Sequence, residues 1–261
     1  MESIPSELFT AFNDITFYDE PHKYFLGGKE LISVTTLIGK YHEPFDEDYW
    51  SGYKATEYNL TPEEVLRAWK FINRKGTIKG SAIHDYAENL FQNKKFEYPQ
   101  QMILNEFGFD PVWNEYEITK KHVDKFYNEV QGKLIPIRTE MVVYDKETLI
   151  GGMLDILFYN VKMKEFQIWD WKTNKKFDRE NKERYLLGNL CTIEDSDLEV
   201  YSLQLEMYKQ IIEKNVPIKL GQSYIVWFSH RNESYEIIKT TDRKFHVGVI
   251  LDERKQQLSA A

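Results

Sequence analysis

The chain has 261 residues, of which 42% are hydrophobic and 15% aromatic, proportions that exclude a collagen-like, low-complexity or largely disordered chain. Its formal net charge of -8 at pH 7 gives no overall attraction to nucleic acid, so any such binding would need locally concentrated cations. A single cysteine, Cys191, excludes an intramolecular disulfide, a structural zinc cluster and an iron–sulfur cluster held by four thiolates of one chain. No apolar run reaches the roughly 18 to 20 residues that span a bilayer, and Met1 to Phe12 lack a basic start followed by an apolar block, so we expect a cytoplasmic protein.

The chain begins with a pattern typical of short strands. Residues 15–19 and 23–26 alternate in hydrophobicity, and a Gly-Gly turn leads from the second run to residues 31–32. Ser33 follows this third run and is placed to cap a short helix. These features predict a small antiparallel unit at the start of the chain.

Three helices are expected in the next part of the sequence. Thr61, followed by Pro62 and by Glu64, has the pattern of a capping box and predicts a helix that reaches about Ile72. Helical spacing of apolar residues predicts a second helix, beginning between Thr77 and Ser81 and running to about Phe91, and a third over Trp113 to Val130, with Pro136 ending the helical region.

The second half of the chain returns to strands. Residues 137–144, 149–159 and 165–172 predict a three-stranded antiparallel meander with short joins. After it come a helix over 199–212, a hairpin formed by 223–229 and 233–240, and a final helix from about Asp242. The order predicts an α/β fold with a central mixed sheet flanked by helices. Since no repeat or long linker interrupts it, we expect a single domain.

Two carboxylates are expected to meet in the meander. A turn at Lys162 and Met163 pairs residues whose numbers sum to about 325, which places Asp155 opposite Asp170. Lys172 lies two residues after Asp170, so the alternation of a strand puts its ammonium on the same face as both acids. Like charges this close need a cation between them.

This arrangement of two acids and a lysine suits one kind of chemistry. Carboxylate oxygens bind Mg²⁺ or Mn²⁺ and leave room for a phosphate oxygen, and the lysine can position the attacking water or offset charge on the phosphate. The alternative is an ordinary surface salt bridge between Asp170 and Lys172, with Asp155 at a strand end.

Further motifs accompany these residues in a fixed order. They are Gly80-Ser81-Ala82-Ile83-His84, Thr139-Glu140, Gly151-Gly152-Met153-Leu154-Asp155, Ile168-Trp169-Asp170-Trp171-Lys172-Thr173 and Gln204-Leu205-Glu206-Met207-Tyr208. Together they cover about half the chain, and in this order they resemble the PD-(D/E)XK nuclease superfamily. Within it the sequence is most similar to the RecB-like exonuclease group, which includes phage nucleases and the mitochondrial genome maintenance exonuclease. The resemblance implies a PD-(D/E)XK restriction-endonuclease-like core.

The resemblance also implies roles for individual residues. It makes Asp155, Asp170, His84 and the carbonyl of Trp171 metal ligands, and Lys172 the catalytic lysine. Glu140 would support the metal or orient Lys172, and Gln204 and Tyr208 would contact the substrate backbone or that lysine. Simpler alternatives are that His84 pairs with Glu88 one helical turn away and that Tyr208 belongs to the core.

Two groups of basic residues are candidates for contacting substrate. Lys70, Arg74, Lys75 and Lys79 fall in one stretch without an acid, and residues 172–184 hold six cations against three acids. Solvated surface is the alternative for both groups. From them we select Lys75, Lys79, Lys175 and Lys176 as substrate-binding residues.

The resemblance implies a Mg²⁺- or Mn²⁺-dependent DNA exonuclease without an iron–sulfur cluster or bound nucleotide, acting in phage or bacterial recombination, replication or repair. We expect residues 1–75 to form an N-terminal hairpin and helical decoration, 76–240 the catalytic core and 241–261 a C-terminal helix. The expected partner is DNA that is single-stranded or has single-stranded ends, with a helicase, recombinase or single-strand-binding protein as a separate chain and no membrane. A structure-selective endonuclease and a catalytically silent DNA-binding or adaptor protein stay open as alternatives. So do polarity, strand preference, RNA as substrate, the number of metals and the oligomeric state.

Overall fold

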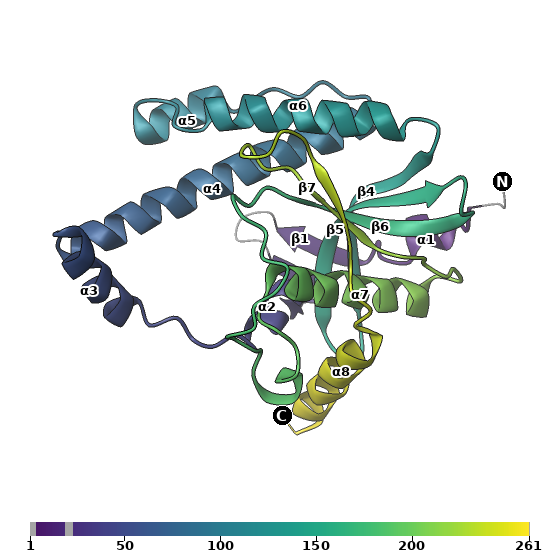
Figure 1. The fold of residues 1–261 in the computed structure, drawn as a ribbon. Coiled ribbons are helices and arrows are strands. Elements are labelled where there is room, and N and C mark those ends of the chain that lie inside the picture. The colour runs from purple at the N-terminus through teal and green to yellow at the C-terminus, as the bar shows by residue number, and fades with distance from the viewer. Residues whose placement is uncertain (1–3, 19–22, 261) are drawn as a thin grey trace.

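The structure, a computed structural model, describes residues 4–18 and 23–260. In this part of the chain eight strands form one mixed sheet with helices on both faces (Figure 1). The strands are β1 (Ile15–Tyr18), β2 (Lys23–Leu26), β3 (Lys29–Ser33), β4 (Leu134–Asp145), β5 (Ile150–Asn160), β6 (Glu165–Lys172), β7 (Tyr224–Trp227) and β8 (Glu236–Lys239). The expected α/β fold with a mixed sheet is therefore confirmed.

The sheet contains the predicted meander. β4 pairs antiparallel with β5, and β5 pairs antiparallel with β6 in a register that joins Ile156 to Trp169. These two numbers sum to 325, so the expected register of this hairpin is confirmed. β6 then pairs in parallel with β7, and β3 pairs in parallel with the beginning of β5, which makes the sheet mixed.

Helices cover the sheet on both sides, and a hydrophobic core lies between the sheet and each set of helices. They are α1 (Glu7–Thr10), α2 (Val34–Gly39), α3 (Glu47–Tyr58), α4 (Pro62–Phe91), α5 (Gln100–Phe107), α6 (Trp113–Val130), α7 (Asp197–Asn215) and α8 (Lys244–Ser259). One core joins the sheet to α2, α7 and α8, and the other joins it to α4, α5 and α6 (Figure 1). None of the helices within the described residues combines the length and apolar character needed to cross a lipid bilayer.

The predicted N-terminal caps of α2 and α4 are both present. The Ser33 side chain accepts a hydrogen bond from the Thr36 backbone N–H and caps α2. Thr61 and Glu64 form a reciprocal capping box at the start of α4. Each satisfies backbone N–H groups that a helix start leaves without partners.

The expected break between Ile72 and Thr77 is wrong, because α4 is one helix of 30 residues. A glycine inside a helix costs only about 1 kcal/mol relative to alanine, and α4 contains two, Gly76 and Gly80. Burial of Ile78, which lies between them, and of the apolar residues that follow offsets that cost. The boundary expected after residue 75 therefore falls inside a helix.

Other differences lie at the ends of elements. Pro136 does not end the helical region: it lies inside β4, where the register shifts before Arg138. A proline is tolerated there because β4 pairs with β5 alone and is an edge strand. The sequence pattern gave no expectation for α3 or α5. The segment 181–197, also without one, contains a short 3₁₀ turn at Gly188–Leu190 and an isolated bridge between Tyr185 and Glu194, and its last residue begins α7. Residue 19 of the first expected strand lies outside the described residues.

Candidate metal centre

Asp155 and Asp170 lie side by side on β5 and β6. Ile156 pairs with Trp169, so Asp155, which precedes Ile156, lies beside Asp170, which follows Trp169. Asp155 Oδ2 accepts a hydrogen bond from the Trp171 backbone N–H at 2.5 Å. Asp155 is 9% exposed and Asp170 2% exposed. Both carboxylates are therefore withdrawn from solvent. An ordinary salt bridge between Asp170 and Lys172 on the protein surface does not account for this burial.

His84 and Glu140 join Asp155 from two other elements. The Nδ1 atom of His84, on α4, lies 3.3 Å from Asp155 Oδ1. One ligand atom from each of His84, Glu140 and Asp155 lies within 4.8 Å of the others, so this group is suited to holding a metal ion. The alternative partner of His84 is engaged elsewhere, because Glu88 Oε1 accepts a hydrogen bond from Gln92 Nε2 at 2.6 Å.

Glu140 reaches this group through an unusual backbone conformation. Its φ of 43° lies in the left-handed region, which residues with a side chain seldom adopt. In the ladder between β4 and β5, Thr139 pairs with Ile156 and Met141 with Leu154, while Glu140 falls between these pairs. Such backbone strain is often found at functional sites, where it aims a side chain.

Lys172 completes the cluster. Its Nζ lies 2.6 Å from Asp170 Oδ2 and 4.3 Å from the centre of the Tyr201 ring on α7. Tyr201 in turn accepts a hydrogen bond from Asn174 Nδ2 at 2.9 Å. The ammonium is therefore held between a carboxylate and an aromatic face, an arrangement that favours the charged lysine.

Burial and neighbouring charges shift the pKa values of the acids and the histidine in this cluster. Burial, followed by the charge of Asp155, raises the pKa of Glu140 to about 8. Burial also raises the pKa of Asp170 to about 6, against the opposing charge of Lys172. Burial lowers the pKa of His84, but the charge of Asp155 and the contact with it outweigh burial and raise that pKa to about 9.

The two remaining groups keep their charge. Burial alone would raise the pKa of Asp155, but the charge of His84, its contact with that ring and the charge of Lys172 hold it below the usual value. Burial would lower the pKa of Lys172, and the charge of Asp170 reverses the effect and raises it.

These residues fit a hard divalent cation. Carboxylate oxygens with one imidazole form a ligand set that suits Mg²⁺ or Mn²⁺, and a cation would relieve the repulsion among Glu140, Asp155 and Asp170. Asp170 Oδ2 is buried and, within the described residues, receives no hydrogen bond of acceptable geometry, although Lys172 Nζ is close. The predicted role of the Trp171 carbonyl stays a prediction, and its indole lies in the core on the α4 side.

The two predicted residues of α7 contact each other. Gln204 Nε2 donates to the Tyr208 hydroxyl at 3.2 Å, and both side chains are buried. The aromatic ring that contacts Lys172 is that of Tyr201, not Tyr208. Tyr201 lies three residues before Gln204 and therefore on the same face of the helix. Extending the Gln204–Tyr208 stripe one turn toward the start of the helix would have found it.

Gly152 allows Tyr208 to approach β5. A Cβ atom built on Gly152 would lie 2.5 Å from Cε1 of Tyr208, well inside van der Waals contact. Gly152→Ala should therefore destabilise the protein by about 1 to 3 kcal/mol, as overpacked cores do. The measurement is the free energy of unfolding in urea.

Gly52→Ala is the matched control for this substitution. Gly52 lies within α3, and its added Cβ would meet no atom within 4 Å. We expect Gly52→Ala to stabilise the protein by about 0.5 to 1 kcal/mol, because alanine is the better helix former. Equal effects of the two alanines would contradict the proposed close approach.

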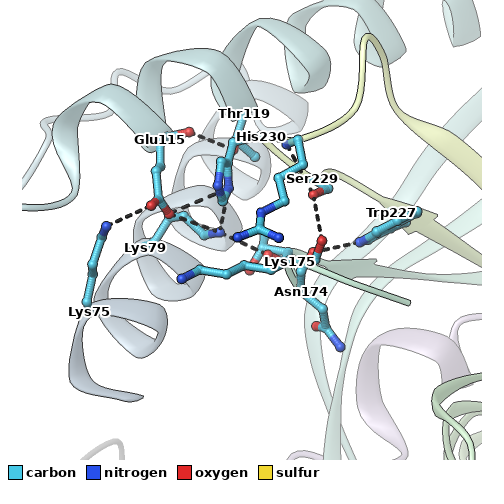
Figure 2. Close-up of polar contacts among 11 residues, drawn as sticks. Lys75, Lys79, Glu115, Thr119, Asn174, Lys175, Trp227, Ser229 and His230 are labelled. Carbon is cyan, nitrogen blue, oxygen red and sulfur yellow. Dashed lines mark hydrogen bonds and ion pairs between the residues drawn. The ribbon is translucent and has the colours of Figure 1, made fainter. Parts of the chain in front are cut away.

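The basic stretch of α4 contains no acid of its own, but acids from other helices contact it. Lys75 Nζ lies 2.7 Å from Glu115 Oε1, and Arg74 forms an ion pair with Glu106. Lys79 lies close to Glu115 and His230 (Figure 2), is only 3% exposed and donates to the Thr173 carbonyl oxygen at 3.0 Å. The acids come from α5 and α6, so the local sequence around the lysines could not show them. Lys175 and Lys176, the other two predicted substrate contacts, are exposed.

No protein-family model matches the chain, and no curated protein matches it. Among solved structures, it is similar to a protein of Eubacterium rectale described as a "Putative exonuclease", with a TM-score of 0.40 and 11% identity over 71% of this chain and 65% of that one. It is also similar to the protein SSO0001, with a TM-score of 0.29 and 11% identity over 70% of this chain and 87% of that one. Both TM-scores are below 0.5, so we base the proposed function on the geometry of the site.

Proposed function

We propose that this protein is a metal-dependent nuclease with a PD-(D/E)XK core of the RecB-like group, and that it acts as a DNA exonuclease. The observation that carries the proposal is the convergence of His84, Glu140 and Asp155 within 4.8 Å, with the Asp170–Lys172 pair on the adjoining strand. Buried clusters of acids and one lysine are costly for a fold to maintain, which supports a functional role.

Each side chain has a distinct part in the proposed reaction. Asp155, Glu140 and His84 hold the cation together with Asp170. When bound, Mg²⁺ or Mn²⁺ would polarise the phosphoryl oxygen and lower the pKa of water. Lys172, kept as an ammonium beside Asp170 and Tyr201, donates hydrogen bonds that orient the water and offset negative charge on the phosphate. In the proposed reaction, hydrolysis leaves a 5′-phosphate and a 3′-hydroxyl.

The experiment that tests this function uses the purified full chain on end-labelled linear DNA. Single-stranded, double-stranded and circular single-stranded DNA are each incubated with Mg²⁺, Mn²⁺ or EDTA. We expect stepwise shortening of the linear DNA that requires the metal and spares the circle. The labelled end that shortens first gives the polarity.

The other outcomes identify the alternatives. Cleavage of the circle would make the protein an endonuclease, because a circle has no end to attack. RNA is tested in parallel, since the site chemistry does not distinguish the two sugars. Binding without hydrolysis of any substrate in either metal would contradict the nuclease and favour a DNA-binding protein.

A further inference from the structure

A pocket of about 360 Å³ lies beside the candidate metal centre and is not part of it. It lies between α4 and the chain that leaves β6, and its lining includes Lys75, Gly76, Lys79, Thr173 and Lys175. Thr173 directly follows Lys172, so the two sites are joined by a single peptide bond. Figure 2 shows three lysine side chains gathered beside Glu115 and His230.

Lys79 is the fixed element of this pocket. Its Nζ donates to the Thr173 carbonyl oxygen at 3.0 Å and lies 3.4 Å from His230 Nδ1 and 3.7 Å from Glu115 Oε2. Although Lys79 is only 3% exposed, it borders the pocket. The ammonium of a buried lysine is preorganised to donate hydrogen bonds, because little side-chain entropy remains to be lost on binding.

The charges around the pocket do not cancel. Lys75, Lys79 and Lys175 contribute three positive charges, and Glu115, the only acid in the pocket lining, contributes one negative charge. Burial lowers the pKa of Lys79, and despite Glu115 the nearby charges of Lys175 and Lys75 act in the same direction. His230 does not add charge, since burial and then Lys79 lower its pKa. The lining of the pocket therefore carries two more positive than negative charges.

We infer that this pocket binds a phosphate group of the substrate strand, next to the phosphodiester that lies at the metal centre. The inference rests on the proposed function for its position, since a strand that reaches Lys172 passes Thr173. Gly76, with open space where its side chain would be, leaves room on α4 for the group to enter. Lys79, Lys75 and Lys175 then donate to the phosphate oxygens as charge-assisted hydrogen bonds.

Lys175 and Lys162 provide a matched pair for the test. Both are exposed, but Lys175 lines the pocket, whereas Lys162 lies in the turn at the opposite end of β6 and does not line it. Replacement of either by alanine removes the same charge and is not expected to unfold the protein. The dissociation constant of a short single-stranded DNA with a 3′-fluorophore is measured by anisotropy, in EDTA and over a series of salt concentrations.

We expect Lys175→Ala to weaken binding by about tenfold, the equivalent of one hydrogen bond to a charged group, and Lys162→Ala by less than about twofold. The salt dependence of log K should also become shallower by about 0.7 in Lys175→Ala, since one phosphate contact on a single strand is lost. Equal losses in the two variants, no loss in Lys175→Ala, or no binding by the unmodified protein at low salt would overturn the inference.

Two DNA ligands show which phosphate is bound. One carries a 5′-phosphate and the other a 5′-hydroxyl. If Lys175→Ala affects only the first, the pocket takes a terminal phosphate; if it affects both equally, the pocket takes an internal one. Because binding is measured without divalent metal, a pocket that fails this test leaves the cleavage assay unaffected. A protein that binds through Lys175 but never cleaves would overturn the nuclease instead.

Discussion

Lys172→Gln should lower the rate of DNA cleavage by about 10³-fold, as expected when a charged donor at the reacting phosphate is lost. In the structure Lys172 is the group that pairs with Asp170 and lies over Tyr201, so glutamine removes both the donor charge and the partner of a buried acid. The measurement is the single-turnover rate of shortening of labelled linear DNA in Mg²⁺. Lys162→Gln, in the exposed turn between β5 and β6, is the matched control and should keep full activity.

A loss of activity must be separated from a loss of folding. Removal of Lys172 leaves the buried Asp170 without its cation, which costs about 3 to 5 kcal/mol for a buried ion pair. The double variant Asp170→Asn/Lys172→Gln leaves no uncompensated charge and should be inactive yet folded, as seen by circular dichroism and thermal unfolding. Full activity in Lys172→Gln would reject the assignment of this lysine, and with it the proposed mechanism.

The metal-free protein should lose stability as pH rises from about 6 to about 9. The pKa values of Glu140 and His84 are raised to about 8 and 9, so in this range the folded state holds their protons more tightly than the unfolded state. The stability they contribute is fully present below their ordinary pKa values and is lost as pH passes the raised ones. Asp155, whose pKa is lowered, adds stability that is already complete in this range and does not change the direction.

Mg²⁺ should reverse this dependence, since metal ligands must be deprotonated and binding therefore strengthens at high pH. The measurement is the thermal midpoint in EDTA and in Mg²⁺ across this pH range. Glu140→Gln should flatten the slope in EDTA and remove most of the stabilisation by Mg²⁺. Glu183→Gln, at an exposed position, should change neither. A slope in EDTA that survives Glu140→Gln unchanged would show that Glu140 does not titrate as the geometry requires.

The parts of the site set by local sequence rules were predictable. The position of the turn at Lys162 determines the register of β5 with β6, and that register alone brings Asp155 beside Asp170. Strand alternation then places Lys172 on the face of Asp170. The capping box at Thr61 and the apolar spacing of α6 gave helix positions for the same reason, because both depend on residues within a few positions of each other.

The parts that depend on distant residues were not predictable. The left-handed backbone of Glu140 arises where β4 pairs irregularly with β5, and the residue type carries no signal for it. Glu115, which neutralises part of the lysine charge, lies 40 residues from Lys75 in sequence. The continuity of α4 through Gly76 and Gly80 comes from packing, which outweighs the weak helix propensity of glycine.

The unbroken α4 has a further consequence. One unbroken helix carries Lys75 and Lys79 at the lysine-lined pocket and His84 at the candidate metal centre. Lys75 and His84 are nine residues apart, which at 1.5 Å per residue sets their axial separation at about 13.5 Å, with no loop to absorb a change. In the proposed nuclease, a strand held at the pocket would therefore meet the metal centre at a distance fixed by the helix.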